Sequence, residues 1–131
     1  MQFAIRAATE GDLEALNEII GDVDALHREH LPHVFRNPDG PSRERDYMLD
    51  LLWDESYGLF VAEAQEPVQE DTEGAILGFV QIAIQDAPPI PLLVPRRVAR
   101  VENLGVRKDA RRAGIGRALM DHAQRLSLIH I

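Results

Sequence analysis

Hydrophobic and polar positions recur with clear periods in the first third of the chain. Residues 3–8 alternate between apolar and polar side chains, a pattern that predicts a short strand. Apolar residues then recur at helical spacing from Leu13 onward until Pro32 interrupts them, which predicts a helix. Thr9 and Asp12 stand three residues apart just before this stripe, as in a capping box. We therefore expect a strand followed directly by a capped helix.

A turn and a second helix are predicted next. Residues 37–41 read Asn-Pro-Asp-Gly-Pro, a cluster typical of turns, and Ser42 is the expected N-cap of the helix that follows. Trp53 is expected in the core. Four further residues are expected on the buried side of this helix: Tyr47, Met48, Leu51 and Leu52.

The rest of the chain alternates between apolar runs and polar or proline-rich connections. Residues 58–64, 75–84 and 98–106 are predicted strands, and the second of these is apolar enough to be the central strand of a sheet. Residues 65–74 are polar and predict an exposed hairpin loop. Four prolines between residues 87 and 95 exclude an interior strand there. A loop over residues 107–113 is expected to lead into a helix from about residue 114 to residue 125.

Composition narrows the class of protein. A chain of 131 residues with 45% hydrophobic and 27% charged residues suits one globular α/β domain. No apolar run approaches the roughly 20 residues needed to span a bilayer, and the N-terminus does not resemble a secretion signal. The chain has no cysteine, which excludes disulfides, thiolate zinc sites and a cysteine nucleophile. We expect a cytoplasmic protein with no membrane partner.

Charge is distributed unevenly along the sequence. The net charge is −8, which argues against a nucleic-acid partner, yet residues 96–117 carry a net charge of +6 and the remainder −14. Such a local excess predicts either a site for an anionic ligand or a solvated arginine-rich face. Eight basic residues form it: Arg96, Arg97, Arg100, Arg107, Lys108, Arg111, Arg112 and Arg117.

The connection from the last predicted strand to the last helix has the features of a phosphate site. A helix start leaves about four backbone N–H groups without partners at the positive end of the helix dipole. Gly114 and Gly116 would let an anion approach the backbone, and arginines at positions 111, 112 and 117 would add charge-assisted contacts. The alternative is an ordinary strand-to-helix connection in which the glycines only turn the chain.

Two common phosphate motifs do not match this segment. The dinucleotide-binding fingerprint requires a third glycine where Leu119 stands, followed by an acidic residue some 20 positions later. The P-loop requires Gly-Lys-Ser/Thr, which is absent. A different phosphate-containing ligand is therefore expected.

The order of motifs resembles the GNAT family, the GCN5-related N-acetyltransferases that use acetyl-coenzyme A. Their signature, Gln/Arg-x-x-Gly-x-Gly/Ala, is matched by Arg111-x-x-Gly114-x-Gly116. The strand Glu102-Asn103-Leu104-Gly105-Val106 and the opening segment 5–13 are similar to theirs as well. The resemblance implies a mixed α/β (α+β) fold in which helices flank a mostly antiparallel sheet. The implied element order is β-α-α-β-β-β-α, without the family's C-terminal strands.

The same resemblance implies how acetyl-CoA, the cosubstrate, would be held. The backbone of Leu104, Gly105 and Val106 would bond the pantetheine arm and the acetyl carbonyl, and a strand distortion common in the family would suit Gly105. The pyrophosphate would lie against the residues of the loop and the helix start: Arg111, Arg112, Ala113, Gly114, Ile115, Gly116 and Arg117.

Glu102 occupies the strand position where many members of the family place a general base. It would help to deprotonate an acceptor amine, which attacks the thioester directly without a covalent enzyme intermediate. The alternative is a structural carboxylate paired with Arg97, Arg100 or Arg107. For the whole chain, the alternatives to an N-acetyltransferase are a noncatalytic acyl-CoA-binding or regulatory module and a purely structural fragment.

Three histidines precede the first turn, at positions 27, 30 and 33. Their spacing drifts around a helix and no thiolate accompanies them, so no metal is expected. The resemblance instead suggests that this segment, with Glu29 and Phe35, lines the pocket for the acceptor amine, which is a small molecule or a peptide.

The last six residues of the sequence differ in origin from the rest, in our interpretation. Residues 126–131, Leu-Ser-Leu-Ile-His-Ile, are one reading frame of CTGTCTCTTATACACATC, the end of a transposase-based sequencing adapter. We expect them to be a non-native tail and residues 1–125 to be the N-terminal part of a GNAT domain; the alternative is a native strand beginning at Leu128. The family's tyrosine general acid would then be missing, so this chain would be inactive. The exposed sheet edge would be available for association into a homodimer.

Overall fold

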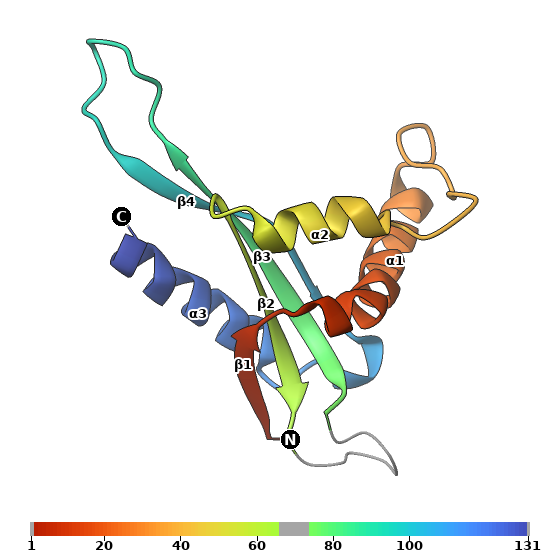
Figure 1. Cartoon of the computed structure of the whole chain (residues 1–131). Helices are drawn as coiled ribbons and strands as arrows, with labels where there is room; N and C mark the ends of the chain where they lie inside the picture. Colours follow the sequence, from red (N-terminus) through yellow and green to blue (C-terminus); the bar gives the residue numbers. More distant parts are fainter. Residues whose placement is uncertain (1, 66–73, 131) are drawn as a thin grey trace.

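One antiparallel sheet with helices on both faces forms the framework of the computed structural model, which describes residues 2–65 and 74–130 (Figure 1). The sheet order is β1-β2-β3-β4, and β3 is central in that it pairs with both β2 and β4, as predicted. Most of the predicted 65–74 loop lies outside the described residues. The elements are β1 (Phe3–Ala7), a 3-10 turn (Glu10–Asp12), α1 (Leu13–His30), α2 (Arg45–Trp53), β2 (Tyr57–Ala64), β3 (Ile76–Asp86), β4 (Arg97–Val106), a second 3-10 turn (Lys108–Ala110) and α3 (Ile115–His130).

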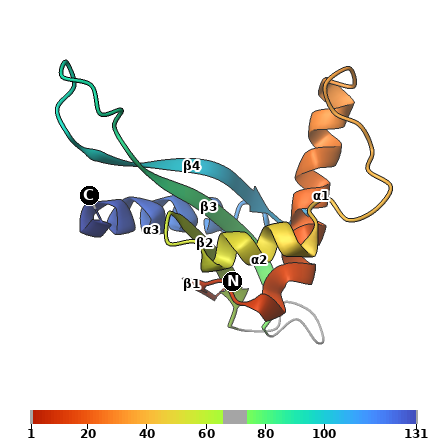
Figure 2. The ribbon, with the colours of Figure 1, turned by 45° about the horizontal axis from the view of Figure 1, so that its top comes forward.

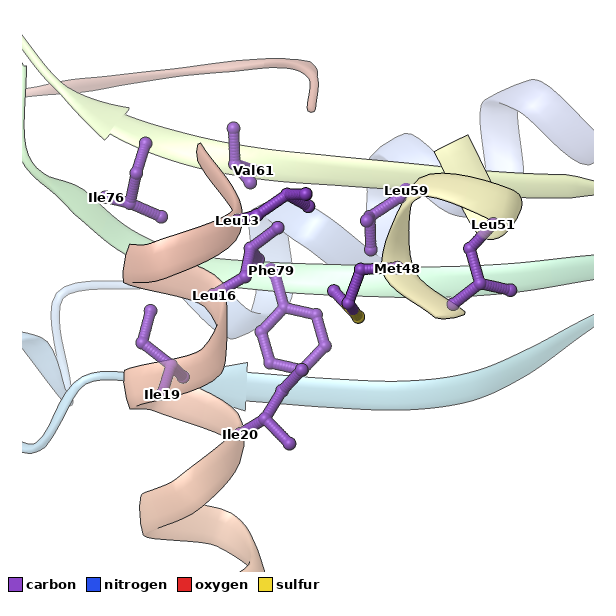
Figure 3. Packing of buried hydrophobic residues seen from close by; sticks show 10 residues of the cluster. All are labelled: Leu13, Leu16, Ile19, Ile20, Met48, Leu51, Leu59, Val61, Ile76 and Phe79. Carbon is purple, nitrogen blue, oxygen red and sulfur yellow. The ribbon is translucent and has the colours of Figure 1, made fainter. Parts of the chain in front are cut away.

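The hydrophobic core lies in two layers, one on each face of the sheet. Helices α1 and α2 cover one face, where their apolar stripes pack on β2 and β3 (Figure 3). Helix α3 covers the other face through Ile115, Leu119 and Ala123. The first layer consists of Leu13, Leu16, Ile19, Ile20, Met48, Leu51, Leu59, Val61, Ile76 and Phe79.

Two glycines on neighbouring strands allow the helices to approach the sheet closely. A Cβ atom on Gly78 would lie 2.8 Å from the carbonyl oxygen of Gly105 and 3.1 Å from Ile115 of α3. A Cβ atom on Gly105 would lie 2.7 Å from Phe79 and 3.1 Å from Ile19 of α1. The shorter distance at each position, 2.8 Å and 2.7 Å, is too short for a Cβ atom to be accommodated without movement of its surroundings. These two positions therefore bring α3 and α1 against opposite faces of the same part of the sheet.

The predicted cap at the start of α1 is present and belongs to a larger polar cluster. The backbone N–H of Thr9 donates to the Asp12 carboxylate at 2.8 Å, and Arg6 donates to the same carboxylate at 2.7 and 2.9 Å. Arg6 also pairs with Glu63 on β2. The hydrogen bonds from Arg6 hold the pKa of Asp12 below its usual value, against the opposing effect of burial. This cluster joins the first strand, the first helix and β2.

The start of α2 differs from the prediction. The helix begins at Arg45 with Glu44 at the N-cap position, so Ser42 is not its cap. Instead, the backbone N–H of Arg43 donates to the side-chain oxygen of Asn17 on α1 at 2.9 Å. The helix therefore begins two residues later than predicted, beside this contact with α1.

The buried side of α2 was predicted correctly only in part. Met48 and Leu51 are buried and Leu52 packs against the core, but Tyr47 is 50% exposed. Trp53, expected in the core, is 70% exposed. It follows Met48 by five residues and therefore lies on a different face of the helix.

The connection between β3 and β4 projects beyond the helices (Figure 2). Residues 87–96 contain no strand, as the prolines predicted. At the other end, α3 continues to His130, so a strand beginning at Leu128 is not formed. In the described part of the chain, no helix has the length and apolarity needed to cross a membrane.

The Asp12 cluster predicts how stability depends on pH. Because the pKa of Asp12 is lower in the folded chain than in the unfolded chain, its carboxylate stabilises the fold above the ordinary value of 3.8. That contribution is lost as the pH falls below this value. We expect Asp12→Asn to lower the free energy of unfolding by about 1–2 kcal/mol at pH 7 and to weaken its decline in acid. Urea unfolding from pH 3 to 7 measures both effects, and the exposed Asp39→Asn should change neither.

Candidate functional site

The start of α3 leaves a row of backbone amides unused. The first amide of this segment that donates a hydrogen bond within the described residues is that of Ala118, which bonds to the carbonyl oxygen of Gly114 at 3.0 Å. Among the described residues, no oxygen accepts a hydrogen bond from the amides of residues 112–117. These amides lie at the positive end of a helix 16 residues long. The arrangement can bind an anion.

Gly114 and Gly116 contribute to this helix start in different ways. Gly114 has a φ of +80°, which L side chains rarely adopt, and no atom lies within 4 Å of where its Cβ would be. Gly116 is helical, and its Cβ would meet Val106 at an ordinary contact distance of 3.7 Å. Only Gly114 is thus required by the backbone, and the space around its Cβ position at the helix start is open.

Arg112 also has an unusual backbone conformation, with a φ of 68°. A non-glycine residue in this region costs roughly 1–2 kcal/mol, and such conformations concentrate at functional sites. The loop thus adopts the left-handed conformation at two residues, Arg112 and Gly114, with Ala113 between them. This turn leads directly to the first residue of α3, Ile115.

The basic stretch divides into paired and unpaired residues. Arg97 pairs with Asp86 at 3.0 Å, Arg100 with Glu102 at 2.7 Å and Arg107 with Asp109 at 2.7 Å. In the described part of the chain, the other basic residues of the stretch have no acidic partner within 4 Å: Arg96, Lys108, Arg111, Arg112 and Arg117. Three of the five lie in or beside the loop whose amides are unused. The positive charge is therefore concentrated at the helix start.

Strand β4 lies beside this loop at the edge of the sheet. Within the described residues it pairs only with β3. Gly105 is buried between Phe79 and α1, whereas the Leu104 side chain is 36% exposed. The backbone N–H of Leu104 donates to the side-chain oxygen of Asn103 at 3.1 Å. A ligand that accepts a hydrogen bond from the Leu104 amide would have to displace the Asn103 side chain. No pattern in the sequence indicated this hydrogen bond between Leu104 and Asn103.

Glu102 lies at an irregularity of β4. Gln81 pairs with Asn103 and Ile82 with Val101, so the register shifts and no residue stands opposite Glu102. We expected such a distortion at Gly105, which instead pairs regularly with Phe79. A bulge turns a side chain away from the regular alternation of the strand, so the irregularity acts on the predicted base itself.

The Glu102 side chain is 30% exposed and accepts a hydrogen bond from Arg100. This bond raises the pKa of the Arg100 guanidinium. In this structure Glu102 is thus paired with a neighbouring arginine, which is the arrangement expected if it were a structural carboxylate and not a base. Arg100 bonds to one oxygen of the carboxylate, and this contact lies near the surface, where an ion pair is weak.

The histidine segment lies at the end of α1. The ring of His27 packs against that of Phe35 with centroids 5.3 Å apart, so the two residues expected in the acceptor pocket touch. His30 ends α1, and His33 and Phe35 follow it in the connection to α2. Among the described residues, no group of three His, Asp or Glu side chains is placed to hold a metal ion.

The sequence matches the family model described as Acetyltransferase (GNAT) family over residues 23–128. Among curated proteins, none is significantly similar to the sequence.

Solved structures share its fold. A mutant of the BH1408 protein from Bacillus halodurans is 22% identical, with a TM-score of 0.82 over 97% of this chain and 76% of that one. An acetyltransferase from Vibrio fischeri is 22% identical, with a TM-score of 0.69 over 93% and 84%. An aminoglycoside N-acetyltransferase in complex with CoA is 16% identical, with a TM-score of 0.65 over 97% and 72%.

The two glycines at the start of α3 should respond oppositely to alanine. Gly114→Ala forces a side chain into a positive φ and is expected to lower the free energy of unfolding by about 1–2 kcal/mol. Gly116→Ala adds a Cβ at an ordinary contact distance within a helix and should raise it by up to about 1 kcal/mol. Thermal or urea unfolding of both variants measures the two changes, and equal effects would contradict the assigned backbone roles.

Proposed function

Because the chain belongs to the GNAT acetyltransferase family, we propose that it transfers an acetyl group from acetyl-CoA to an amine. The acceptor is a small molecule or a peptide. The observation that carries the proposal is the row of unused amides at the start of α3, in front of which Gly114 leaves open space.

The pyrophosphate of the coenzyme would bind at this helix start. Residues 111–117 supply the amides, and the unpaired Arg111, Arg112 and Arg117 supply positive charge. A diphosphate is bound well where N–H donors and positive charge lie together, because it carries several oxygen acceptors and a high negative charge. The CoA bound to a structural neighbour, an aminoglycoside N-acetyltransferase, supports this choice among phosphate-containing ligands.

The pantetheine arm would follow the free edge of β4. In this proposal the backbone groups of Leu104, Gly105 and Val106 bond the arm and the acetyl carbonyl, and the Leu104 amide exchanges Asn103 for the ligand. Glu102 lies on the same strand, two residues before Leu104 and farther from the start of α3 along the chain. The thioester is thereby placed beside the carboxylate while the phosphates remain at the helix start.

The reaction needs a neutral amine. An amine with a pKa near 10.4 is mostly protonated at pH 7, and removing that proton requires roughly 4–5 kcal/mol. Glu102 would accept the proton, directly or through water, as the amine nitrogen attacks the thioester carbonyl. The N–C bond forms, the C–S bond breaks, and the departing thiolate takes up a proton.

A noncatalytic acyl-CoA-binding module would share the binding site but not the chemistry. Coenzyme affinity therefore cannot separate the two functions. Release of free thiol from acetyl-CoA in the presence of a panel of amines does separate them, because only the enzyme produces it.

Coenzyme binding should depend on Gly114. We expect Gly114→Val to abolish binding of CoA in calorimetry, because the branched side chain occupies the space in front of the amides. Gly40→Val, in the exposed 37–41 turn where no atom lies within 4 Å of the Cβ position, is the matched control and should bind CoA as the original chain does. Circular dichroism establishes that both variants are folded. Unchanged affinity of folded Gly114→Val would refute the phosphate site.

Turnover should depend on Glu102. In the acetyl-transfer assay, Glu102→Gln is expected to lower kcat by about 100-fold and to leave the affinity for CoA nearly unchanged, since the amide cannot accept the proton. Glu55→Gln, which changes an exposed carboxylate outside the site, serves as the control. Equal rates for Glu102→Gln and the original enzyme would remove Glu102 from the mechanism.

A further inference from the structure

Helix α2 exposes two large aromatic side chains on the side away from the sheet. Trp53 is 70% exposed and Tyr47 50% exposed, although residues of this size usually bury most of their surface. In neither view does another described helix or strand cover this side of α2 (Figure 1, Figure 2). Tryptophan and tyrosine are the residues most enriched where proteins bind partners. This exposed surface lies apart from β4 and the start of α3.

Carboxylates accompany the aromatic residues on the same side. Asp46, Asp50 and Trp53 follow one another at intervals of four and three residues, so they form one stripe along the helix. All three are exposed, as is Tyr47 beside them. We name these four residues the α2 outer face. Met48 and Leu51 lie on the opposite side and anchor the helix to the core.

The charge of this face is not neutralised within the described part of the chain. Neither Asp46 nor Asp50 has an ion pair there. The two arginines at the start of the helix are engaged elsewhere, Arg45 with Glu10 at 2.7 Å and Arg43 with Asp24 at 2.9 Å. The α2 outer face therefore combines unpaired negative charge with exposed aromatic rings.

We propose that the α2 outer face binds a lysine- or arginine-rich peptide segment of a partner protein. Aromatic faces attract guanidinium and ammonium groups, and the two carboxylates can accept charge-assisted hydrogen bonds from them. Charge complementarity identifies the occupant, since an apolar or acidic partner would leave Asp46 and Asp50 unpaired.

The shape of the surface selects a peptide over a small cation. From Asp46 to Trp53 the stripe extends along about 10 Å of helix, the length of roughly three residues of extended chain. A convex helix face does not enclose a small molecule, which requires a concave pocket. Several basic side chains of one segment can instead contact the stripe together.

The chain carries its own reporter of binding, because Trp53 is its single tryptophan. Titration of the full chain with nona-arginine at low salt should change the Trp53 fluorescence in a saturable way. Hexa-glutamate should produce no change. Added salt should weaken the binding, because the contacts are between exposed charges.

Substitutions test which residues bind the peptide. The double variant Asp46→Asn/Asp50→Asn should bind nona-arginine about tenfold more weakly in the same titration. Trp53→Phe should retain most of the binding measured by calorimetry, and Trp53→Ala should lose about threefold. Asp39→Asn, an exposed carboxylate in the 37–41 turn, is the matched control and should bind as the original chain does.

Four results would overturn the proposal. The first is peptide binding without a change in Trp53 fluorescence, and the second is equal affinities of the double variant and Asp39→Asn. The third is spermidine binding as tightly as nona-arginine, which would indicate a site for small cations. The fourth is a fluorescence change on raising the protein concentration alone, which would assign the face to a second copy of this chain.

Discussion

The candidate site depends on how closely two helices can approach the middle of the sheet. Gly78 and Gly105 lie on neighbouring strands, and a Cβ atom on either would collide with its surroundings. Because Gly78 has no side chain, Ile115 packs against β3 and the first turn of α3 lies close to β4. Because Gly105 has no side chain, Ile19 of α1 packs closely against the other face of the sheet. A bulkier residue at position 78 would separate the loop amides from the strand edge beside them, and one at position 105 would push α1 away from the opposite face.

Electrostatics then determine what this arrangement can hold. Acidic partners neutralise Arg97, Arg100 and Arg107 along β4 and just after it. The arginines nearest the amides of α3 have no such partner among the described residues, so positive charge and N–H donors converge on one place. An acidic protein thereby combines a positively charged helix start at α3 with an unpaired negative surface on α2.

Local patterns predicted the framework because the forces behind them are local. The alternation in β1 and the stripe of α1 each bury one face, and the prolines of residues 87–95 cannot pair within a sheet. The prediction of α2 was less accurate for the opposite reason. Its start is set by the contact of Arg43 with Asn17 on α1, and its stripe leaves Trp53 exposed. Neither the hydrogen bond between Arg43 and Asn17 nor the exposure of Trp53 can be predicted from the neighbouring residues of the sequence.

For the site, the sequence alone predicted which residue types gather at the helix start. Glycines, arginines and a predicted strand-to-helix junction indicate an anion-binding loop, because backbone amides and charge act over a few residues. Tertiary structure decided which groups are free to act. It showed that Gly114, not Gly116, has a positive φ, that Glu102 is the irregular residue of β4, and that Arg100 contacts it. These properties depend on strand register and on pairing between side chains, which no single segment encodes.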